Sequence, residues 1–164
     1  MVNYKEFIND IPNFPKEGII YRDIQPLLSN SETFTQIIDD FGRIITDLPD
    51  YWVGIESRGF IFAAALSYAF GGGLRLVRKK GKLPNEKTFF VEYGLEYGND
   101  ALEFADFPTD VGSCIIVDDV YATGGTMDAA TRLVGKHGLS IIDKLCVVDI
   151  GIKPHHDVKT LIQY

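Results

Sequence analysis

Strand-like and helix-like patterns alternate along this chain, and the alternation limits its fold more than any other feature. Short apolar runs typical of buried strands occur at 51–55, 74–77, 113–117, 141–150 and 160–163. Apolar residues at helical spacing occur before the first of these runs, at 32–48, and between later ones, at 60–70 and 126–134. Strands separated by helices imply right-handed crossovers. We therefore expect one α/β domain over residues 1–164, with a doubly wound, mostly parallel sheet flanked by helices.

Two segments, residues 78–108 and the N-terminal residues, do not fit this alternation. Residues 78–108 form a long insertion with two aromatic, strand-like pieces at 88–93 and 101–104. A long insertion in a compact domain is more often a functional lid than an idle loop, so we expect a lid built on a hairpin. Near the start, residues 4–11 have the spacing of a short amphipathic helix that ends at Pro12. Ser31 is the expected N-cap of the next helix.

Charge and composition exclude several classes of protein. The net charge of −7 argues against a nucleic-acid or membrane-surface partner, because either would favour a basic surface. No apolar run is long enough to span a membrane, and the first residues carry acids and prolines rather than a signal core. Cys114 and Cys146 lie in apolar runs and are expected to be buried thiols. We expect a soluble, cytoplasmic protein.

The stretch from Asp118 to Thr126 suits a ribose 5-phosphate. Its two glycines allow backbone N–H groups to close on a phosphate, and the flanking threonine hydroxyls add donors at the start of the next helix. Asp118 and Asp119 can accept hydrogen bonds from two ribose hydroxyls. No lysine follows Gly125, as a nucleoside-triphosphatase loop requires, and the acids precede the glycines, unlike in a dinucleotide fingerprint. The alternative is an ordinary strand–turn–helix connection with incidental aspartates.

Two more polar groups follow predicted strands. The tetrapeptide Glu56-Ser57-Arg58-Gly59 can turn backbone donors onto an anion. A basic cluster follows the next strand; a solvated loop is its ordinary interpretation, but beside a phosphate site it favours a polyanion such as pyrophosphate. Since parallel strands end at one edge of the sheet, we expect these groups to lie near Asp118. The basic residues are Arg75, Arg78, Lys79, Lys80 and Lys82.

The tetrapeptide Pro154-His155-His156-Asp157 raises the possibility of a metal site. Adjacent histidines in a proline-bounded loop converge poorly on one ion. We therefore expect a solvated turn there.

These motifs resemble known ones. Val117-Asp118-Asp119 followed by Ala122-Thr123-Gly124-Gly125-Thr126 is similar to the phosphoribosyl pyrophosphate (PRPP) motif of the type I phosphoribosyltransferases. Further tracts resemble the adenine phosphoribosyltransferase family over nearly the whole chain: the base-binding segment at 14–24, the pyrophosphate loop at 57–60, and the flexible catalytic loop at 78–84 with Leu95-Glu96-Tyr97-Gly98. The last four residues resemble the end of some members, so we expect a complete chain.

The resemblance implies a role for each matching residue. Asp118 and Asp119 would bind the ribose hydroxyls, and Glu96 and Arg58 would be catalytic, with Glu96 handling the purine proton. Adenine would be bound within an N-terminal hood, residues 1–30, by the backbone of Ile20 and Arg22, with Tyr21 packed on its ring. The 5-phosphate would contact Ala122, Thr123, Gly124, Gly125 and Thr126. Pyrophosphate would contact Ser57, Arg58, Arg78, Lys79 and Lys82, with Arg78 reaching into the neighbouring site of a homodimer.

The implied activity is transfer of the 5-phosphoribosyl group from PRPP to adenine, which gives AMP and pyrophosphate in purine salvage. Mg²⁺ is the implied cofactor, held mainly by PRPP near Asp118 and Asp119 without direct protein ligands. Two alternatives stay open: the same transfer to hypoxanthine, guanine or xanthine, and a non-catalytic regulator that senses PRPP or purines. A regulator would be expected to lose the lid glutamate or the basic loop, and this chain keeps both. Tyr121 and Glu56 depart from the usual family pattern, which has an aliphatic residue and a smaller or shorter residue there.

Overall fold

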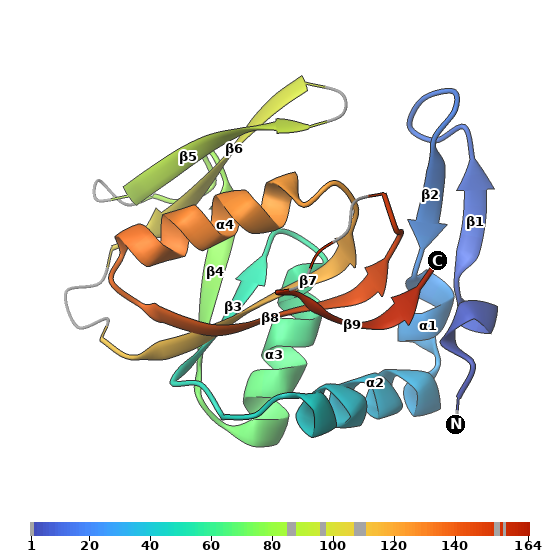
Figure 1. The fold of residues 1–164 in the computed structure, drawn as a ribbon, viewed down its shortest axis with the longest axis horizontal. Coiled ribbons are helices and arrows are strands. Elements are labelled where there is room, and N and C mark those ends of the chain that lie inside the picture. Colours follow the sequence, from blue (N-terminus) through green and yellow to red (C-terminus); the bar gives the residue numbers. More distant parts are fainter. Residues whose placement is uncertain (1, 85–87, 96–97, 107–110, 153–154, 156) are drawn as a thin grey trace.

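A seven-stranded sheet forms the centre of the molecule, in the order β5-β6-β4-β3-β7-β8-β9 (Figure 1). The computed structural model describes residues 2–84, 88–95, 98–106, 111–152, 155 and 157–164. Five strands are parallel: β3 (Tyr51–Ile55), β4 (Gly73–Lys79), β7 (Ser113–Tyr121), β8 (Ser140–Asp149) and β9 (Lys159–Gln163). The expected α/β fold with a mostly parallel sheet is confirmed.

Helices cover both faces of the sheet (Figure 1). Helices α2 (Ser31–Ile44) and α3 (Gly59–Phe70) pack on one face with Ile115 and Val117, while α4 (Gly125–Lys136) packs on the other with Ile116. Alternate residues of β7 thus enter opposite halves of the core, as the strand period requires. The N-cap of α2 is Asn30, whose side chain accepts from the N–H groups of Glu32 and Thr33, so the expected cap at Ser31 was one residue late. Among the described residues, no helix is both long and apolar enough to cross a membrane.

The N-terminal residues form a small unit of their own beside the end of the chain (Figure 1). Strands β1 (Asn9–Pro12) and β2 (Ile20–Asp23) pair antiparallel as a separate sheet, preceded by a 3₁₀ turn, η1 (Tyr4–Phe7), and followed by a short helix, α1 (Gln25–Ser29). The predicted helix over residues 4–11 is therefore wrong beyond its first turn. An isolated helix of two turns gains little stability, whereas pairing with β2 satisfies the backbone of Asn9–Pro12.

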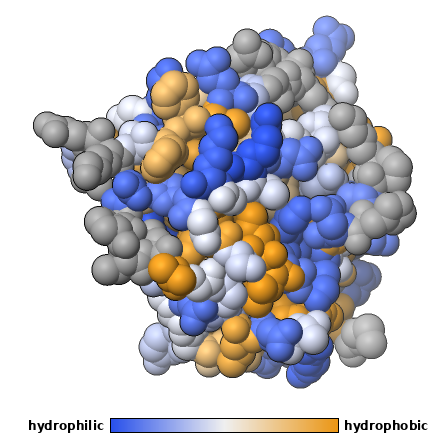
Figure 2. Space-filling view, turned by 60° about the vertical axis from the view of Figure 1, so that its left-hand side comes forward, coloured by the Kyte–Doolittle hydropathy of each residue, from blue (hydrophilic) through white to orange (hydrophobic). Residues whose placement is uncertain are grey.

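The insertion after β4 contains the expected hairpin, β5 (Thr88–Leu95) and β6 (Gly98–Ala105). The hairpin is not separate from the sheet: β6 pairs antiparallel with the end of β4, and Val91, Leu102 and Phe104 enter the core under α4. Figure 2, in which the side carrying β5 and β6 in Figure 1 comes forward, shows hydrophobic patches among hydrophilic residues. The described part of the predicted lid therefore also forms one edge of the sheet.

Candidate active site

An acidic pair lies inside β7. The strand continues beyond its apolar run to Tyr121, so Asp118 and Asp119 lie within the strand and not after it. The two residues are only 8% and 5% exposed, and Asp118 Oδ1 accepts a hydrogen bond of 2.9 Å from the N–H of Asp119. Buried carboxylates at the carboxyl half of a parallel strand are rare unless paired or functional.

The two carboxyl groups have perturbed pKa values. Burial and the charge of Asp119 raise the pKa of Asp118 well above its ordinary value. Burial also raises the pKa of Asp119, and the guanidinium of Arg58 works against this rise. A ligand that supplies hydroxyl donors or positive charge would stabilise the ionised form of this pair.

Arg58 joins the acidic pair to the N-terminal hairpin. Its Nε lies 2.7 Å from Asp119 Oδ2, and its Nη1 donates to the hydroxyl of Tyr21 at 2.8 Å and to the carbonyl of Arg22 at 3.4 Å. The close contact between α3 and β7 makes this link possible, because a Cβ at Gly59 would lie 2.6 Å from the carbonyl oxygen of Val117. The sequence placed Arg58 near pyrophosphate but gave no sign of its contact with the hairpin.

Glu56 and Arg78 connect the ends of β3 and β4. Glu56 Oε2 accepts from Arg78 Nε at 2.9 Å and from the N–H of Lys79 at 2.8 Å. Burial acts to raise the pKa of Glu56, but these hydrogen bonds outweigh it and hold that pKa below its ordinary value. In this chain Arg78 is therefore already paired, and contact with a neighbouring subunit would require the pair to open.

A buried glutamate that the sequence interpretation missed holds the basic loop. Glu103 of β6 is 6% exposed, and its carboxylate accepts from the N–H groups of Gly81, Lys82 and Leu83 at 2.6–3.1 Å. The available signal was an acid within the otherwise apolar run at 101–105, in the second half of the strand. Through these contacts Glu103 fixes the backbone around Lys82.

Arg75 does not join the basic cluster. It is buried in β4, where it donates to the carbonyl of Ala105 at 2.7 Å and packs on the ring of Phe104. Lys79, in contrast, lines the site cavity together with Asp100, and its Nζ lies 3.2 Å from Asp100 Oδ2. The interpretation of Arg75 as part of a polyanion site is wrong, because strand alternation turns it toward the core.

The glycine turn leads directly into α4. Gly124 is the N-cap, with a φ of +84°, and a Cβ there would lie 2.5 Å from the hydroxyl of Tyr121. A helix N-terminus of this kind presents free N–H groups to an anion. Tyr93 of β5 lines the site together with Thr126 and Asp100, and burial raises its pKa above the ordinary value. Tyr93 and Asp100 are site neighbours that the sequence interpretation did not include.

These groups meet in one cavity of about 320 Å³. It brings together residues predicted to bind ribose, pyrophosphate and the 5-phosphate, as expected for the carboxyl edge of the sheet. The residues that line it are Glu56, Ser57, Arg58, Lys79, Tyr93, Asp100, Asp118, Asp119, Val120 and Thr126.

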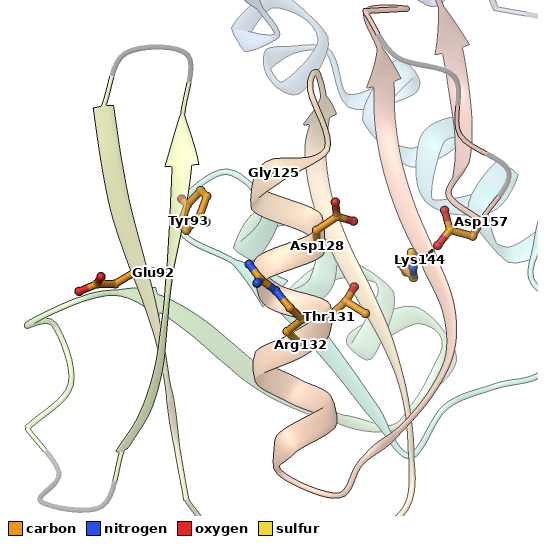
Figure 3. Close-up of a pocket in the computed structure, with 8 residues that line it drawn as sticks. All are labelled: Glu92, Tyr93, Gly125, Asp128, Thr131, Arg132, Lys144 and Asp157. Atoms are coloured by element: carbon orange, nitrogen blue, oxygen red, sulfur yellow. Dashed lines mark hydrogen bonds and ion pairs between the residues drawn. The ribbon is translucent and has the colours of Figure 1, made fainter.

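A wider hollow of about 770 Å³ runs along α4 (Figure 3). Tyr93 and Gly125 line it beside side chains of both charges, including an ion pair between Lys144 and Asp157. It contains a single predicted site residue, Gly125. We therefore assign the site to the smaller cavity.

The predicted base-binding residues lie on β2. Tyr21 contacts Arg58 and packs edge-on against the exposed ring of Phe14, with ring centroids 5.3 Å apart. Ile20 is also exposed, while Arg22 pairs with Asp10 and lies over the ring of Tyr164 at 3.9 Å. The hairpin thus offers an aromatic surface next to Arg58. Glu96, the predicted proton handler, lies outside the described residues.

Comparison with known proteins agrees with this class of fold and site. Residues 23–163 match the family described as the phosphoribosyl transferase domain, and the chain belongs to that family. Similar proteins carry a more specific name than this family description. An adenine phosphoribosyltransferase of Thermotoga maritima is 44% identical, covering 99% of this chain and 98% of that protein. One of Anaeromyxobacter dehalogenans is 50% identical, covering 82% of this chain and 79% of that protein.

Solved structures agree. The adenine phosphoribosyltransferase of Thermoanaerobacter pseudethanolicus has a TM-score of 0.90 at 35% identity, covering 98% of each chain. That of Saccharomyces cerevisiae, solved with an imino-altritol bisphosphate and adenine, has a TM-score of 0.86 at 35% identity, covering 96% of this chain and 95% of that one. The resemblance to this family that the sequence predicted is confirmed.

Proposed function

We propose that the protein transfers the 5-phosphoribosyl group of PRPP to adenine, giving AMP and pyrophosphate in purine salvage. One observation carries the proposal: Arg58 bridges the buried acidic pair and the aromatic hairpin, through Asp119 and Tyr21. A sugar bound by the acids and a flat base on the hairpin would therefore lie side by side. The adenine phosphoribosyltransferases among its relatives support adenine as the base.

Asp118 and Asp119 would accept hydrogen bonds from the ribose hydroxyls. The turn from Ala122 to Thr126 would bind the 5-phosphate with backbone N–H groups and two hydroxyls. As the bond from the anomeric carbon to pyrophosphate breaks, positive charge grows on the ribose. In this assignment the buried carboxylates of Asp118 and Asp119 would stabilise that charge.

Cations would receive the leaving pyrophosphate. Ser57, Arg58, Arg78, Lys79 and Lys82 are the groups we assign to it. In the free protein Arg78 is held by Glu56 and Lys79 by Asp100, so acids hold these two side chains at the site edge before a substrate arrives. Charge arranged in advance needs little reorganisation during the reaction.

The acidic pair fits Mg²⁺ only in part. Among the described residues no group of three or more His, Cys, Asp or Glu side chains could hold a metal ion, and Asp119 is already paired with Arg58. Magnesium commonly takes one or two carboxylates together with substrate phosphates. We therefore propose that PRPP carries Mg²⁺ beside Asp118 and Asp119, where the ion would neutralise charge on the leaving pyrophosphate.

The base would lie against the hairpin. We assign adenine recognition to the backbone of Ile20 and Arg22, with Tyr21 packed on the ring. When the purine nitrogen bonds to the anomeric carbon, that nitrogen must lose its proton, and we assign the transfer to Glu96. Such general acid–base groups typically contribute about 10²–10⁴-fold to the rate.

We also propose a cytoplasmic homodimer. Helix α3 carries exposed apolar side chains, Ile61 and Tyr68, and Leu74 is exposed at the start of β4. Large apolar side chains exposed on one element are a reason to look for an interface there. The two buried cysteines, both free thiols, are in keeping with a reducing compartment.

Turnover with four bases tests the proposed function. The protein is incubated with Mg²⁺ and PRPP and with adenine, hypoxanthine, guanine or xanthine, and nucleotide formation is followed for each. We expect AMP from adenine at a kcat/KM at least about a hundredfold above that for the other bases, because a base that leaves buried polar groups unpaired is strongly rejected. A nucleotide from another base but none from adenine would overturn the base assignment. Saturable PRPP binding without turnover would favour a regulator.

A further inference from the structure

Tyr121 lies directly under the glycine turn. It is the last residue of β7, is buried, and stands where the family resemblance leads one to expect an aliphatic residue. Its hydroxyl fills the space that a side chain at position 124 would need, since a Cβ on Gly124 would lie 2.5 Å from that oxygen. The shape of the turn is therefore set in part by this tyrosine.

His155 packs on Tyr121, with ring centroids 4.4 Å apart and planes inclined by 56°. Its Nε2 lies 3.0 Å from Asp149 Oδ2, and the other oxygen of Asp149 accepts from the N–H of Gly151 at 2.8 Å. The His155 side chain is 9% exposed. The predicted solvated turn at 154–157 is thus wrong at His155, because the imidazole is buried against the carboxylate of Asp149.

The three residues meet at the ends of two neighbouring strands. Tyr121 and Asp149 are partners in the register of β7 and β8, and the carbonyl of Tyr121 accepts from the N–H of Ile150 at 3.0 Å. His155 Nδ1 is buried without a hydrogen-bond partner among the described residues. Burial of an unsatisfied ring nitrogen disfavours folding, so stability alone gives little reason for this arrangement.

We infer that Tyr121, His155 and Asp149 are positioning residues that hold the 5-phosphate turn in its binding shape. Tyr121 touches the turn, His155 fixes the ring of Tyr121, and Asp149 fixes the imidazole. A turn held in advance binds phosphate without a further ordering cost. The inference rests on the proposed function, which assigns this turn to the 5-phosphate.

Binding of two ligands by the full chain tests this inference by calorimetry. Ribose 5-phosphate probes the turn, and pyrophosphate with Mg²⁺ probes the opposite end of the site. In Tyr121→Leu and in His155→Gln we expect the Kd for ribose 5-phosphate to rise about three- to tenfold, the range of one lost aromatic contact, while the Kd for pyrophosphate changes less than about twofold. Tyr121→Phe keeps the stacked ring and should lose less than Tyr121→Leu. The double variant should be no weaker than the weaker single variant, because the two side chains act through each other.

His137→Gln is the matched control. His137 is another buried imidazole, packed edge-on against Phe89 and Phe104 with centroids 4.7 and 4.8 Å away, and it does not adjoin the turn. We expect it to lower thermal stability without changing the ratio of the two Kd values. Unchanged ribose 5-phosphate binding in a folded Tyr121→Leu or His155→Gln, or equal losses for both ligands, would overturn the inference alone. Failure of the wild type to bind either ligand would overturn the proposed function and the inference together.

Discussion

At the residue scale, the site depends on charges kept away from water. Asp118 and Asp119 are buried side by side, and Arg58 Nε lies 2.7 Å from Asp119 Oδ2. Charge in such surroundings interacts more strongly than at the surface. The free protein therefore holds an acidic pair that a sugar or a cation would stabilise.

The raised pKa of Asp118 predicts a pH effect on stability. A carboxyl group whose pKa is higher in the folded than in the unfolded state stabilises the fold below its unfolded pKa, and this contribution is lost as pH rises through its folded pKa. Asp118→Asn cannot ionise, so without substrate its Tm should rise relative to wild type as pH increases from about 4 to about 8, by several °C. Thermal unfolding over this pH series checks the prediction. Asp128→Asn, an exposed aspartate of α4, controls for the loss of one negative charge. A Tm difference between Asp118→Asn and wild type that stays constant with pH would contradict it.

At the element scale, the structure depends on links that sequence spacing does not reveal. The strand at 51–55 was predicted because a buried parallel strand is a continuous apolar run, and β3 is Tyr51–Ile55. The helix predicted at 4–11 failed because its second half pairs with β2 in a hairpin, and helical spacing within 4–11 does not report that pairing. The contacts of Arg58 with Tyr21 and of Glu103 with the basic loop join residues still farther apart in the chain. No local pattern encodes such contacts.

The basic loop should depend on Glu103. The two oxygens of its carboxylate accept hydrogen bonds from three backbone N–H groups. A glutamine side chain has only one oxygen that can accept, so it cannot replace all three bonds. We expect Glu103→Gln to lower the free energy of unfolding by about 1–3 kcal/mol and to raise the KM for PRPP more than that for adenine. Glu92→Gln, an exposed partner of Lys80, should change neither quantity measurably. Wild-type stability and KM for PRPP in Glu103→Gln would show that the loop does not need this anchor.

The hairpin should depend on Tyr164. The ring of Tyr164 lies under the guanidinium of Arg22 at 3.9 Å and under Lys5 Nζ at 4.7 Å. Cation–π contacts contribute about 0.5–2 kcal/mol, so Tyr164→Ala should raise the KM for adenine about three- to tenfold and leave the KM for PRPP within about twofold. Tyr164→Phe keeps the ring and should resemble wild type in initial-rate measurements. A parallel rise of both KM values in Tyr164→Ala would argue for general loosening of the fold.

At the scale of the whole molecule, the parallel sheet explains why the site could be predicted at all. Glu56 follows β3, Lys79 ends β4 and Asp118 lies in the carboxyl half of β7, and all three line one cavity because parallel strands end at one edge. The sequence showed several of the residues that gather there, but not Tyr93 or Asp100. It did not show that the segment after Arg78 completes the sheet as β5 and β6, because antiparallel edge pairing depends on contacts with β4.

The exposed apolar face of α3 predicts dimer formation. Tyr68 is 94% exposed on this helix, and Glu at this position would place a charge in the proposed interface. We expect Tyr68→Glu to shift the molecular mass in sedimentation from dimer to monomer at micromolar concentration. Val111→Glu, at an exposed apolar residue outside α3, should leave the mass unchanged. A dimeric Tyr68→Glu variant, or a monomeric wild type, would exclude this face as the interface.

The central claim is that the protein transfers the 5-phosphoribosyl group from PRPP to adenine. The stoichiometry of this reaction tests the claim most directly. Phosphorus NMR follows PRPP, AMP and pyrophosphate in one sample that contains the protein, Mg²⁺ and adenine. We expect AMP and pyrophosphate to appear one for one as PRPP disappears, and Asp119→Asn to slow this strongly, because it removes the charge that pairs with Arg58 beside the ribose. Ribose 5-phosphate in place of AMP, or PRPP that persists with adenine present, would contradict the account.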